Sequence, residues 1–317
     1  MDVSKIFDAL NDAQREAVGA TPGPMLVLAG AGSGKTRVLT YRIAYLVQAL
    51  QASPYSILAV TFTNKAASEM RRRIEDFLGF SVRGMWIGTF HGLSHRLLRD
   101  HHELAGLPSG FEILDSDDQY RVIRRALREM NLDEEHWPPR QVQWFINSQK
   151  EEGRRSAALH GTGDAHQQTL IRVYTHYEET CKRLGLVDFA ELLLSALELL
   201  EQNQSLRENY QQRFQHVLVD EFQDSNTIQY RWLKCLALAH GQIMAVGDDD
   251  QSIYGWRGAR IENMAQLQKD FAGTEVVRLE QNYRSTGNIL KAANAVIDLN
   301  PDRMGKNLWT EGDDGEP

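Results

Sequence analysis

Long apolar runs are missing from this chain of 317 residues. No stretch approaches the ~20 consecutive apolar residues that a membrane-spanning helix requires. The first ten residues, Met1–Leu10, include acidic side chains and have no extended apolar core, so they do not resemble a secretory signal peptide. From these absences we expect a protein with no membrane partner that works in the cytoplasm.

Cysteine is nearly absent, and positive charge is in the minority. The two cysteines, Cys181 and Cys235, are too few for a disulfide framework and suit a reducing compartment. The 35 Lys and Arg residues are outnumbered by 43 Asp and Glu residues, which gives a formal net charge of −8. This balance argues against a basic protein that coats nucleic acid, although it leaves room for a local DNA-binding face.

Short apolar runs alternate with helical patterns along much of the chain. Each run is followed by a polar or glycine-containing turn and then by a helix, which predicts a parallel α/β sheet. The predicted strands are Met25–Leu28, Ile57–Val60, Met85–Ile87, His216–Val219, Ile243–Val246 and Val276–Leu279.

The long stretch between the third and fourth of these strands has a mostly helical pattern. Val122–Met130 and Phe189–Leu200 are amphipathic, while Pro138–Pro139 and Gly161–Gly163 predict turns. The polar, glycine-rich tail Thr310–Pro317 predicts a loose end. The simplest architecture is therefore one α/β domain interrupted by a helical insertion, in agreement with the roughly two domains that the length suggests.

A glycine-rich loop follows the first predicted strand and opens a helix. It nearly matches G-x-x-x-x-G-K-[ST], with Ala29 where the first glycine stands. Backbone N–H groups of such a loop wrap phosphates, and the helix N-terminus adds positive potential. Lys35 is expected to reach the β- and γ-phosphates, and the Thr36 hydroxyl to hold Mg²⁺. The residues predicted to bind nucleotide here are Ala29, Gly30, Ala31, Gly32, Ser33, Gly34, Lys35 and Thr36.

Two acids stand directly after the predicted strand His216–Val219. In a parallel sheet, the carboxyl ends of the strands face the ligand crevice. Asp220 is therefore expected to hold Mg²⁺ there, and Glu221 to activate the attacking water as general base. An acidic loop that only caps the next helix is the alternative, and the phosphate-binding loop disfavours it.

Seven stretches, taken in order, resemble the UvrD/Rep/PcrA family of superfamily 1 helicases. The resemblance extends over almost the whole chain, and its last three motifs are long. In that family Ala29 is usual at its position. The matching stretches are Leu10–Arg15, Ala29–Thr36, Thr61–Ala66, Gly88–His91, Val219–Asp224, Val246–Arg257 and Leu279–Ser285.

The resemblance implies a RecA-like ATP-binding lobe formed by residues 1–90 and 215–280. A helical insertion subdomain is then expected over residues 91–214. Residues 281–317 would begin a second lobe that this chain does not complete. The implied function is the ATP- and single-stranded-DNA-binding portion of an ATP-dependent helicase or translocase acting in DNA repair or replication. Expected partners are single-stranded DNA, junctions of single- and double-stranded DNA, and repair proteins.

Further residues around ATP are assigned by the resemblance. Gln14 would read adenine, since an amide pairs with its N6 and N7; the spacing from Asn11 to Gln14 also fits a helix-capping box, and both roles are compatible. Arg37 and Tyr283 would flank the adenine. Catalytic contacts to the γ-phosphate would come from Arg284 and from Gln251, the latter as a sensor.

The resemblance also implies a track for single-stranded DNA. Bases stack on aromatic side chains without regard to sequence, and polar loop residues donate to phosphates. From the residues alone, core positions are the better explanation for Phe62 and Trp256, whereas the resemblance favours contact with DNA. The predicted DNA-binding residues are Phe62, Thr63, Asn64, Thr89, His91, Tyr254 and Trp256.

Three other functions remain as alternatives. A GTPase is disfavoured because Ala67 stands where an N-K-x-D motif beginning at Asn64 needs aspartate. A nuclease-helicase shares these motifs but carries its nuclease elsewhere. A nucleotide-dependent DNA-binding module without turnover is the third, and the intact Lys35, Asp220, Glu221 and Arg284 argue against it.

Overall fold

The computed structural model describes residues 4–160, 164–300 and 303–316. The chain divides into two compact units. The first contains residues 1–90, 205–225 and 233–317, and the second contains residues 91–204 and 226–232. Residues 281–316 therefore fold together with the first unit, while their assignment to the start of a second lobe stays a prediction.

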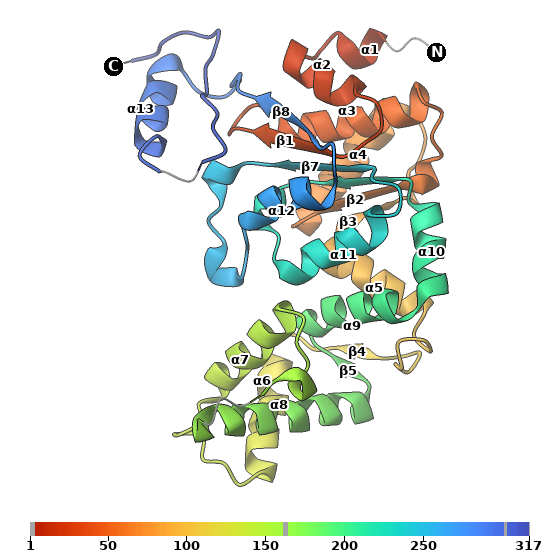
Figure 1. Ribbon diagram of the computed structural model, residues 1–317, viewed down its shortest axis with the longest axis vertical. Helices are drawn as coiled ribbons and strands as arrows, with labels where there is room; N and C mark the ends of the chain where they lie inside the picture. The colour runs from red at the N-terminus through yellow and green to blue at the C-terminus, as the bar shows by residue number, and fades with distance from the viewer. Residues whose placement is uncertain (1–3, 161–163, 301–302, 317) are drawn as a thin grey trace. The chain divides into compact units, whose positions relative to one another are not determined.

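The first unit is built on a six-stranded sheet in the order β3-β2-β6-β7-β1-β8, and every neighbouring pair is parallel (Figure 1). All six predicted strands are present, with ends that differ by at most two residues. The strands are β1 (Met25–Ala29), β2 (Ile57–Thr61), β3 (Trp86–Thr89), β6 (His216–Val219), β7 (Ile243–Gly247) and β8 (Glu275–Leu279). The predicted parallel α/β sheet is confirmed.

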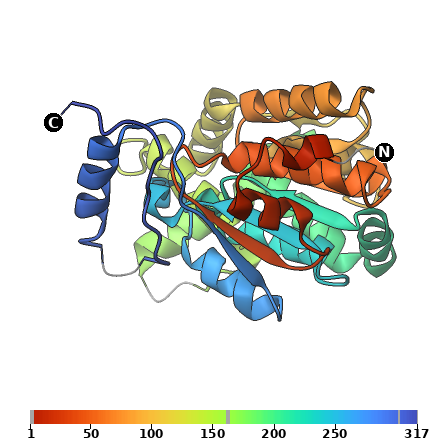
Figure 2. The same ribbon diagram turned by 90° about the horizontal axis from the view of Figure 1, so that it is seen from above.

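The strand order explains where the helices of the first unit lie. The connections from β1 to β2 and from β2 to β3 run in one direction across the sheet, whereas that from β7 to β8 runs in the other. Because such crossovers are right-handed, the helices between them fall on opposite faces. Helices α3 and α4 cover one face and α12 the other, as Figures 1 and 2 show. The helices mainly in this unit are α1 (Ser4–Phe7), α2 (Asp12–Gly19), α3 (Lys35–Gln48), α4 (Asn64–Leu78), α10 (Gln204–Arg213), α12 (Glu262–Asp270) and α13 (Gly287–Ile297).

These strands form the core of the first unit. All five residues of β1, β2 and β7 are buried, as expected for strands covered on both faces. Val27, Ala59 and Val246 from three different strands belong to one apolar cluster with side chains of α2, α3 and α4. The rigid sheet therefore holds the loops at its carboxyl edge in place.

The second unit is mostly helical, as predicted. Its apolar core joins side chains of α6, α7 and α8, among them Ile123, Ile146 and Tyr177. Its elements are α5 (Phe90–Asp100), which starts in the first unit, β4 (Glu112–Ile113), α6 (Ser116–Glu129), α7 (Pro139–Glu151), α8 (Ala165–Leu184), β5 (Leu186–Val187) and α9 (Phe189–Gln202). Helix α11 (Thr227–Ala237) has residues in both units.

Two sequence expectations need correction. Pro139 does not lie in a turn but begins α7, where its missing N–H is no loss because first-turn N–H groups have no partner within the helix. The tail is not loose, because the carbonyls of Asp313 and Asp314 accept backbone hydrogen bonds from Gly287 and Asn288 at the start of α13. The predicted turn Gly161–Gly163 lies outside the described residues.

Candidate nucleotide site and nucleic-acid interface

The glycine-rich loop joins β1 to α3 at the carboxyl edge of the sheet. Gly32 and Gly34 have φ angles of 69° and 92°, in the left-handed region that favours glycine. Ser33 closes the loop by donating to the Gly30 carbonyl from both its N–H, at 3.2 Å, and its hydroxyl, at 2.7 Å. The chain thus turns tightly just before α3, at a helix N-terminus of the kind where glycine-rich loops bind phosphates.

Lys35 begins α3, and its ammonium is buried. The Nζ atom lies 3.0 Å from Oε2 of Glu221, yet the geometry between them is not that of a hydrogen bond. Among the residues that the structure describes, no other group accepts a hydrogen bond from this ammonium. A buried cation with unused donors at the mouth of a phosphate-binding loop fits an anionic ligand, because unpaired buried charges are costly.

The predicted Mg²⁺ ligands lie next to each other. The Thr36 side chain lies close enough to the carboxylate of Asp220, which is 2% exposed, to favour its charged form. Burial and the neighbouring Glu221 raise the pKa of Asp220 to about 7, against the opposing effect of Lys35. Two adjacent oxygen donors, one of them a carboxylate that lacks a full counter-charge, are chemically suited to a hard divalent cation.

Glu221 is held in an unusual backbone conformation. Its φ of 49° lies in the left-handed region, which residues other than glycine seldom adopt and which is frequent at functional sites. Its Oε2 accepts a hydrogen bond from Nε2 of Gln223 at 2.9 Å. Burial, followed by the charge of Glu221, raises the pKa of nearby Asp224 to about 6. No group in the described part of the chain forms a hydrogen bond with the buried Oδ1 of Asp224. This end of β6 thus concentrates carboxylates that are short of positive charge.

Gln14 is buried beside the same loop. The capping box predicted for α2 is present, with Asn11 Oδ1 accepting from the Gln14 N–H at 2.8 Å and Gln14 Oε1 accepting from the Asn11 N–H at 3.2 Å. The Gln14 Nε2 atom also donates to the Ser33 carbonyl at 2.8 Å. One N–H and one lone pair of the amide remain, which is what pairing with adenine needs. The adenine role itself stays a prediction.

The other residues predicted around ATP lie near the loop or on segments bonded to it. The Tyr283 N–H donates to the Gly32 carbonyl at 3.0 Å, and its hydroxyl accepts from Asn11. The Arg37 guanidinium lies 5.5 Å from the ring centre of Tyr41. The exposed Arg284 makes no hydrogen bond or ion pair from its guanidinium to any described residue.

Asn282 and Gln223 also belong to the site, although the sequence did not indicate either of them. The buried Asn282 donates from Nδ2 to the Ala31 carbonyl at 2.5 Å and accepts from the N–H groups of Arg284 and Ser285. Gln223 connects Glu221 to the backbone of Asp248, whose N–H donates to Gln223 Oε1 at 2.9 Å. Both lie inside the matched stretches, but only their tertiary contacts indicate these roles.

The predicted DNA residues after β2 and β3 differ in exposure. Phe62 is half-buried and meets Phe90 edge to face, with ring centres 5.4 Å apart. Thr63 caps α4 by accepting from the Ala66 N–H at 3.1 Å, and the neighbouring Asn64 is exposed. Thr89 is buried. His91 belongs to the second unit, where its ring meets that of Phe189, and burial lowers its pKa.

Tyr254 and Trp256 lie on the surface of the first unit. Trp256 is 72% exposed and Tyr254 is 37% exposed, so the alternative of a core aromatic does not hold for Trp256. The guanidinium of Arg257 lies 4.5 Å from the Trp256 ring centre and 5.3 Å from that of Tyr254. Two exposed rings with an arginine between them form a surface on which bases can stack.

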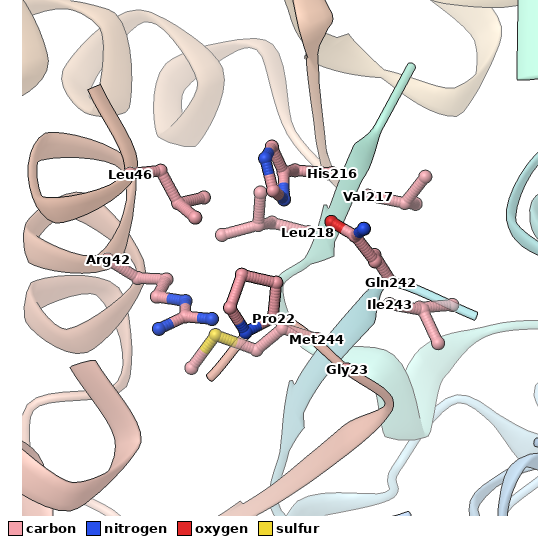
Figure 3. Close-up of a pocket in the computed structure, with 10 residues that line it drawn as sticks. All are labelled: Pro22, Gly23, Arg42, Leu46, His216, Val217, Leu218, Gln242, Ile243 and Met244. Atoms are coloured by element: carbon pink, nitrogen blue, oxygen red, sulfur yellow. The ribbon is translucent and has the colours of Figure 1, made fainter. Parts of the chain in front are cut away.

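A small cavity of about 20 Å³ lies at the amino ends of β6 and β7, away from these loops (Figure 3). Arg42 and His216 line it, and Arg42 donates to the carbonyls of Val18 and Ala20. Burial, then the charges of Arg42 and His240, lower the pKa of His216 to about 4. The cavity has room for about one water molecule and lies at the opposite strand ends from those where parallel sheets bind ligands.

Comparison with known proteins identifies the family. The model of the UvrD/REP helicase N-terminal domain matches residues 10–272. The chain belongs to the UvrD/Rep helicase family. The RecA-like fold expected from the motifs is therefore confirmed.

Relatives with curated names agree with this assignment. The chain is 60% identical over 317 residues to DNA helicase II of Escherichia coli and 58% identical over 321 residues to that of Haemophilus influenzae. It is 44% identical over 313 residues to the ATP-dependent DNA helicase PcrA of Bacillus subtilis. These alignments include 98–100% of this chain but only 42–44% of each relative. No helix among the described residues is long and apolar enough to cross a membrane.

Proposed function

We propose that this chain is the ATP-binding and single-stranded-DNA-binding portion of an ATP-dependent DNA helicase or translocase. One observation carries the proposal: a buried lysine with unused donors at a phosphate-binding loop, beside the Thr36–Asp220 pair and 3.0 Å from Glu221. Relatives named DNA helicase II and ATP-dependent DNA helicase PcrA support it. A nuclease-helicase, or a binding module without turnover, has no such support.

The proposed mechanism starts from the charges of the site. Thr36 and Asp220 would hold Mg²⁺, which neutralises phosphate charge when bound. The phosphates of ATP would give the Lys35 ammonium acceptors in place of its contact with Glu221. Glu221, still oriented by Gln223, would then be free to accept a proton from the attacking water. Arg284 and Gln251 would contact the γ-phosphate, and Gln14, Arg37 and Tyr283 the adenine.

The DNA-binding part of the proposal concerns two surfaces of the first unit. Trp256 and Tyr254, with Arg257 between them, would stack bases, and Phe62 would add a ring beside the Thr63 cap. Asn64 and Thr89 would donate to the DNA backbone. His91, which belongs to the second unit, is a further proposed donor. Such contacts are indifferent to sequence, which suits a motor that moves along a strand. Junctions with duplex DNA and repair proteins are the further partners proposed.

The proposal is tested by nucleotide and DNA binding of the isolated chain. Mg-ATP should raise the melting temperature more than Mg-GTP at equal concentration, and labelled oligo-dT and mixed-sequence strands should bind alike. Equal shifts with ATP and GTP, or no strand binding at low salt, would contradict it. A Glu221→Gln variant should retain the ATP-induced shift, while any hydrolysis that the parent shows should disappear.

We also propose that this chain alone does not unwind duplex DNA. The family's motor works with two lobes around ATP, and the second supplies another arginine to the γ-phosphate. Loss of such an arginine costs ~10³–10⁵ in rate. A strand-displacement assay on a 3′-tailed duplex decides the point, and robust ATP-dependent unwinding by the chain would refute it.

A further inference from the structure

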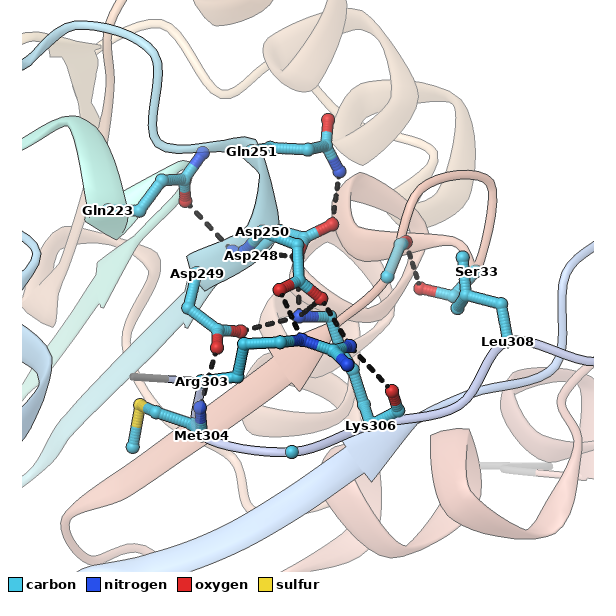
Figure 4. Close-up of polar contacts among 12 residues, drawn as sticks. Ser33, Gln223, Asp248, Asp249, Asp250, Gln251, Arg303, Met304, Lys306 and Leu308 are labelled. Carbon is cyan, nitrogen blue, oxygen red and sulfur yellow. Dashed lines mark hydrogen bonds and ion pairs between the residues drawn. The ribbon is translucent and has the colours of Figure 1, made fainter. Parts of the chain in front are cut away.

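A segment beyond α13 returns to the carboxyl edge of the sheet. Residues 303–309, here called the return segment, run past the loop of residues 248–251 that follows β7 and reach the phosphate-binding loop (Figure 4). At its start, the Met304 N–H donates to Oδ2 of Asp249 at 2.8 Å. Near its end, the Leu308 side chain lies so close to Gly30 that a Cβ there would be 2.1 Å from Leu308 Cδ2. The return segment therefore touches both loops of the candidate site.

Lys306 is the centre of this contact. Its side chain is only 2% exposed, and its Nζ lies 2.6 Å from Asp248 Oδ1, 2.5 Å from Asp249 Oδ1 and 2.7 Å from Asp250 Oδ2. Burial opposes the charged form, but bonds to the three carboxylates outweigh it and raise the pKa of the Lys306 ammonium. The three carboxylates come close enough together to hold a cation, and the cation among them is this ammonium.

Arg303 adds a second positive charge at the edge of the same cluster. Its Nε and Nη2 donate to the two oxygens of Asp250, at 2.8 and 2.9 Å. Arg303 makes no bond to Asp248 or Asp249, so within the described residues Lys306 is the cation that contacts these two carboxylates. Lys306 therefore supplies the counter-charge of Asp248, whose Oδ1 also accepts a hydrogen bond from the Asp250 N–H at 3.1 Å.

Asp248 is in turn hydrogen bonded to two other residues of the site, Gln251 and Gln223. Its Oδ2 accepts a hydrogen bond from Nε2 of Gln251. Its backbone N–H donates to Gln223, which in turn donates to Oε2 of Glu221 at 2.9 Å. A continuous series of bonds therefore leads from Lys306 through Asp248 to both the predicted phosphate sensor and the predicted general base.

We propose that Lys306 is a positioning residue of the nucleotide site, acting through Asp248 on Gln251 and Glu221. The inference rests on the proposed function, since it assigns a role relative to ATP. No sequence motif indicated it: Lys306 lies outside all seven matched stretches and 22 positions beyond Arg284. With a neutral side chain at this position, Asp248 and Asp249 would face each other without counter-charge and the 248–251 loop would rearrange.

The test compares Lys306→Met with Lys291→Met in the 317-residue chain. Lys291 pairs with Asp314 on the surface of the same unit, with side chains 70% and 74% exposed, so it controls for loss of a charge. The first readout needs no nucleotide: hydrogen exchange at the Asp248 N–H, which donates to Gln223. We expect exchange there to accelerate at least tenfold in Lys306→Met and to be unchanged in Lys291→Met.

The second readout is γ-phosphate discrimination, the ratio of the Kd for ADP to the Kd for a non-hydrolysable ATP analogue. We expect this ratio to fall about tenfold in Lys306→Met, since one hydrogen bond to a charged group is lost or misdirected. A purely structural role would lower the melting temperature and leave the ratio as in the parent. Unchanged Asp248 exchange, or an unchanged ratio, would overturn the inference.

A milder variant covers the case in which Lys306→Met does not fold. Asp249→Asn removes a charge that contacts Lys306 and Met304 but neither Gln251 nor Gln223. It should accelerate Asp248 exchange less than Lys306→Met would, with a smaller fall in the ratio, and no change in either would overturn the inference. A parent chain that binds neither nucleotide contradicts the proposed function instead, and the exchange measurement still decides whether Lys306 positions Asp248.

Discussion

The ammonium groups of Lys150 in the second unit and Lys35 in the first are both buried, but their surroundings are opposite. In the second unit, Lys150 is 1% exposed and contacts Asp188 at 2.6 Å and Glu191 at 2.8 Å. Arg155 donates to both oxygens of Glu191, and the Tyr177 hydroxyl donates to Asp188. Despite burial, these two carboxylates raise the pKa of Lys150, and Lys150 and Arg155 lower that of Glu191.

Lys35 in the first unit has no such set of carboxylate partners. Its buried ammonium has one acid, Glu221, within ion-pair distance and no hydrogen bond within the described residues. The pKa of neighbouring Asp220 is raised rather than lowered. The same residue types thus produce a closed structural network in one unit and an open, strained site in the other. A charged group that lacks partners within the protein, rather than a charged group as such, therefore indicates a ligand-binding site.

The largest effect on stability is expected when Lys150 is removed from the ion-pair network of the second unit. Lys150→Met should destabilise the second unit by about 3–5 kcal/mol, because it leaves Asp188 as a buried anion without a cation and takes one of two cations from Glu191. Chemical unfolding followed by circular dichroism, to which the mostly helical second unit contributes strongly, measures this loss. Lys182→Met, at an exposed position of α8, is the control and should shift the transition little. A loss no larger than that of the control would break the comparison.

The next effect concerns the open site and its pH dependence. The pKa of Asp220 in the folded chain, about 7, lies above its ordinary value of 3.8, so the folded state keeps a proton that the unfolded state releases. Stability from this group is therefore present near pH 4 and lost as pH rises to about 7. Asp220→Asn should stabilise the nucleotide-free chain by up to about 4 kcal/mol at pH 8, with little effect at pH 4.

Unfolding at both pH values measures this difference. Asp76→Asn, which changes a 66% exposed carboxylate, is the control and should have a small effect at either pH. If Asp220→Asn behaves like Asp76→Asn at pH 8, the site is not short of positive charge and the comparison with the second unit fails.

A smaller effect distinguishes the surfaces of the two units. Trp256→Ala should weaken binding of single-stranded DNA by about 1–3 kcal/mol, the value of one stacked base. Trp144→Ala is matched in exposure, at 70% against 72%, and should leave binding unchanged because Trp144 belongs to no proposed DNA surface. Fluorescence anisotropy of labelled strands measures both. Equal losses of affinity in the two variants would mean that any exposed tryptophan can bind the strand. A loss of affinity for strands of one base composition alone would indicate direct readout of the bases.

The sheet and the phosphate-binding loop were predictable because their signals are local. Apolar runs mark buried strands, and glycine spacing marks the loop, so Met25–Ala29 and Gly30–Gly34 follow from neighbouring residues alone. The exposure of Trp256 was not predictable, since a core tryptophan and a surface one give the same sequence pattern. Only the folded chain separates them.

The supporting residues depend on contacts between distant segments. Asn282 reaches Ala31 across 251 positions and Lys306 reaches Asp249 across 57, with no periodicity to indicate either pairing. The tail was predicted to be loose from its composition, yet backbone hydrogen bonds to Gly287 and Asn288 hold it. Such pairings arise from tertiary packing, which composition and spacing do not encode.

The central claim, that the open charge at Lys35 awaits the phosphates of ATP, is tested most directly by melting curves of the parent chain and of Lys35→Ala. At a concentration of about 100 times Kd, Mg-ATP should stabilise the parent by about 2.7 kcal/mol. Without nucleotide, the variant should fold, and Mg-ATP should leave its melting temperature unchanged. An ATP-induced shift in Lys35→Ala equal to that of the parent would contradict the account.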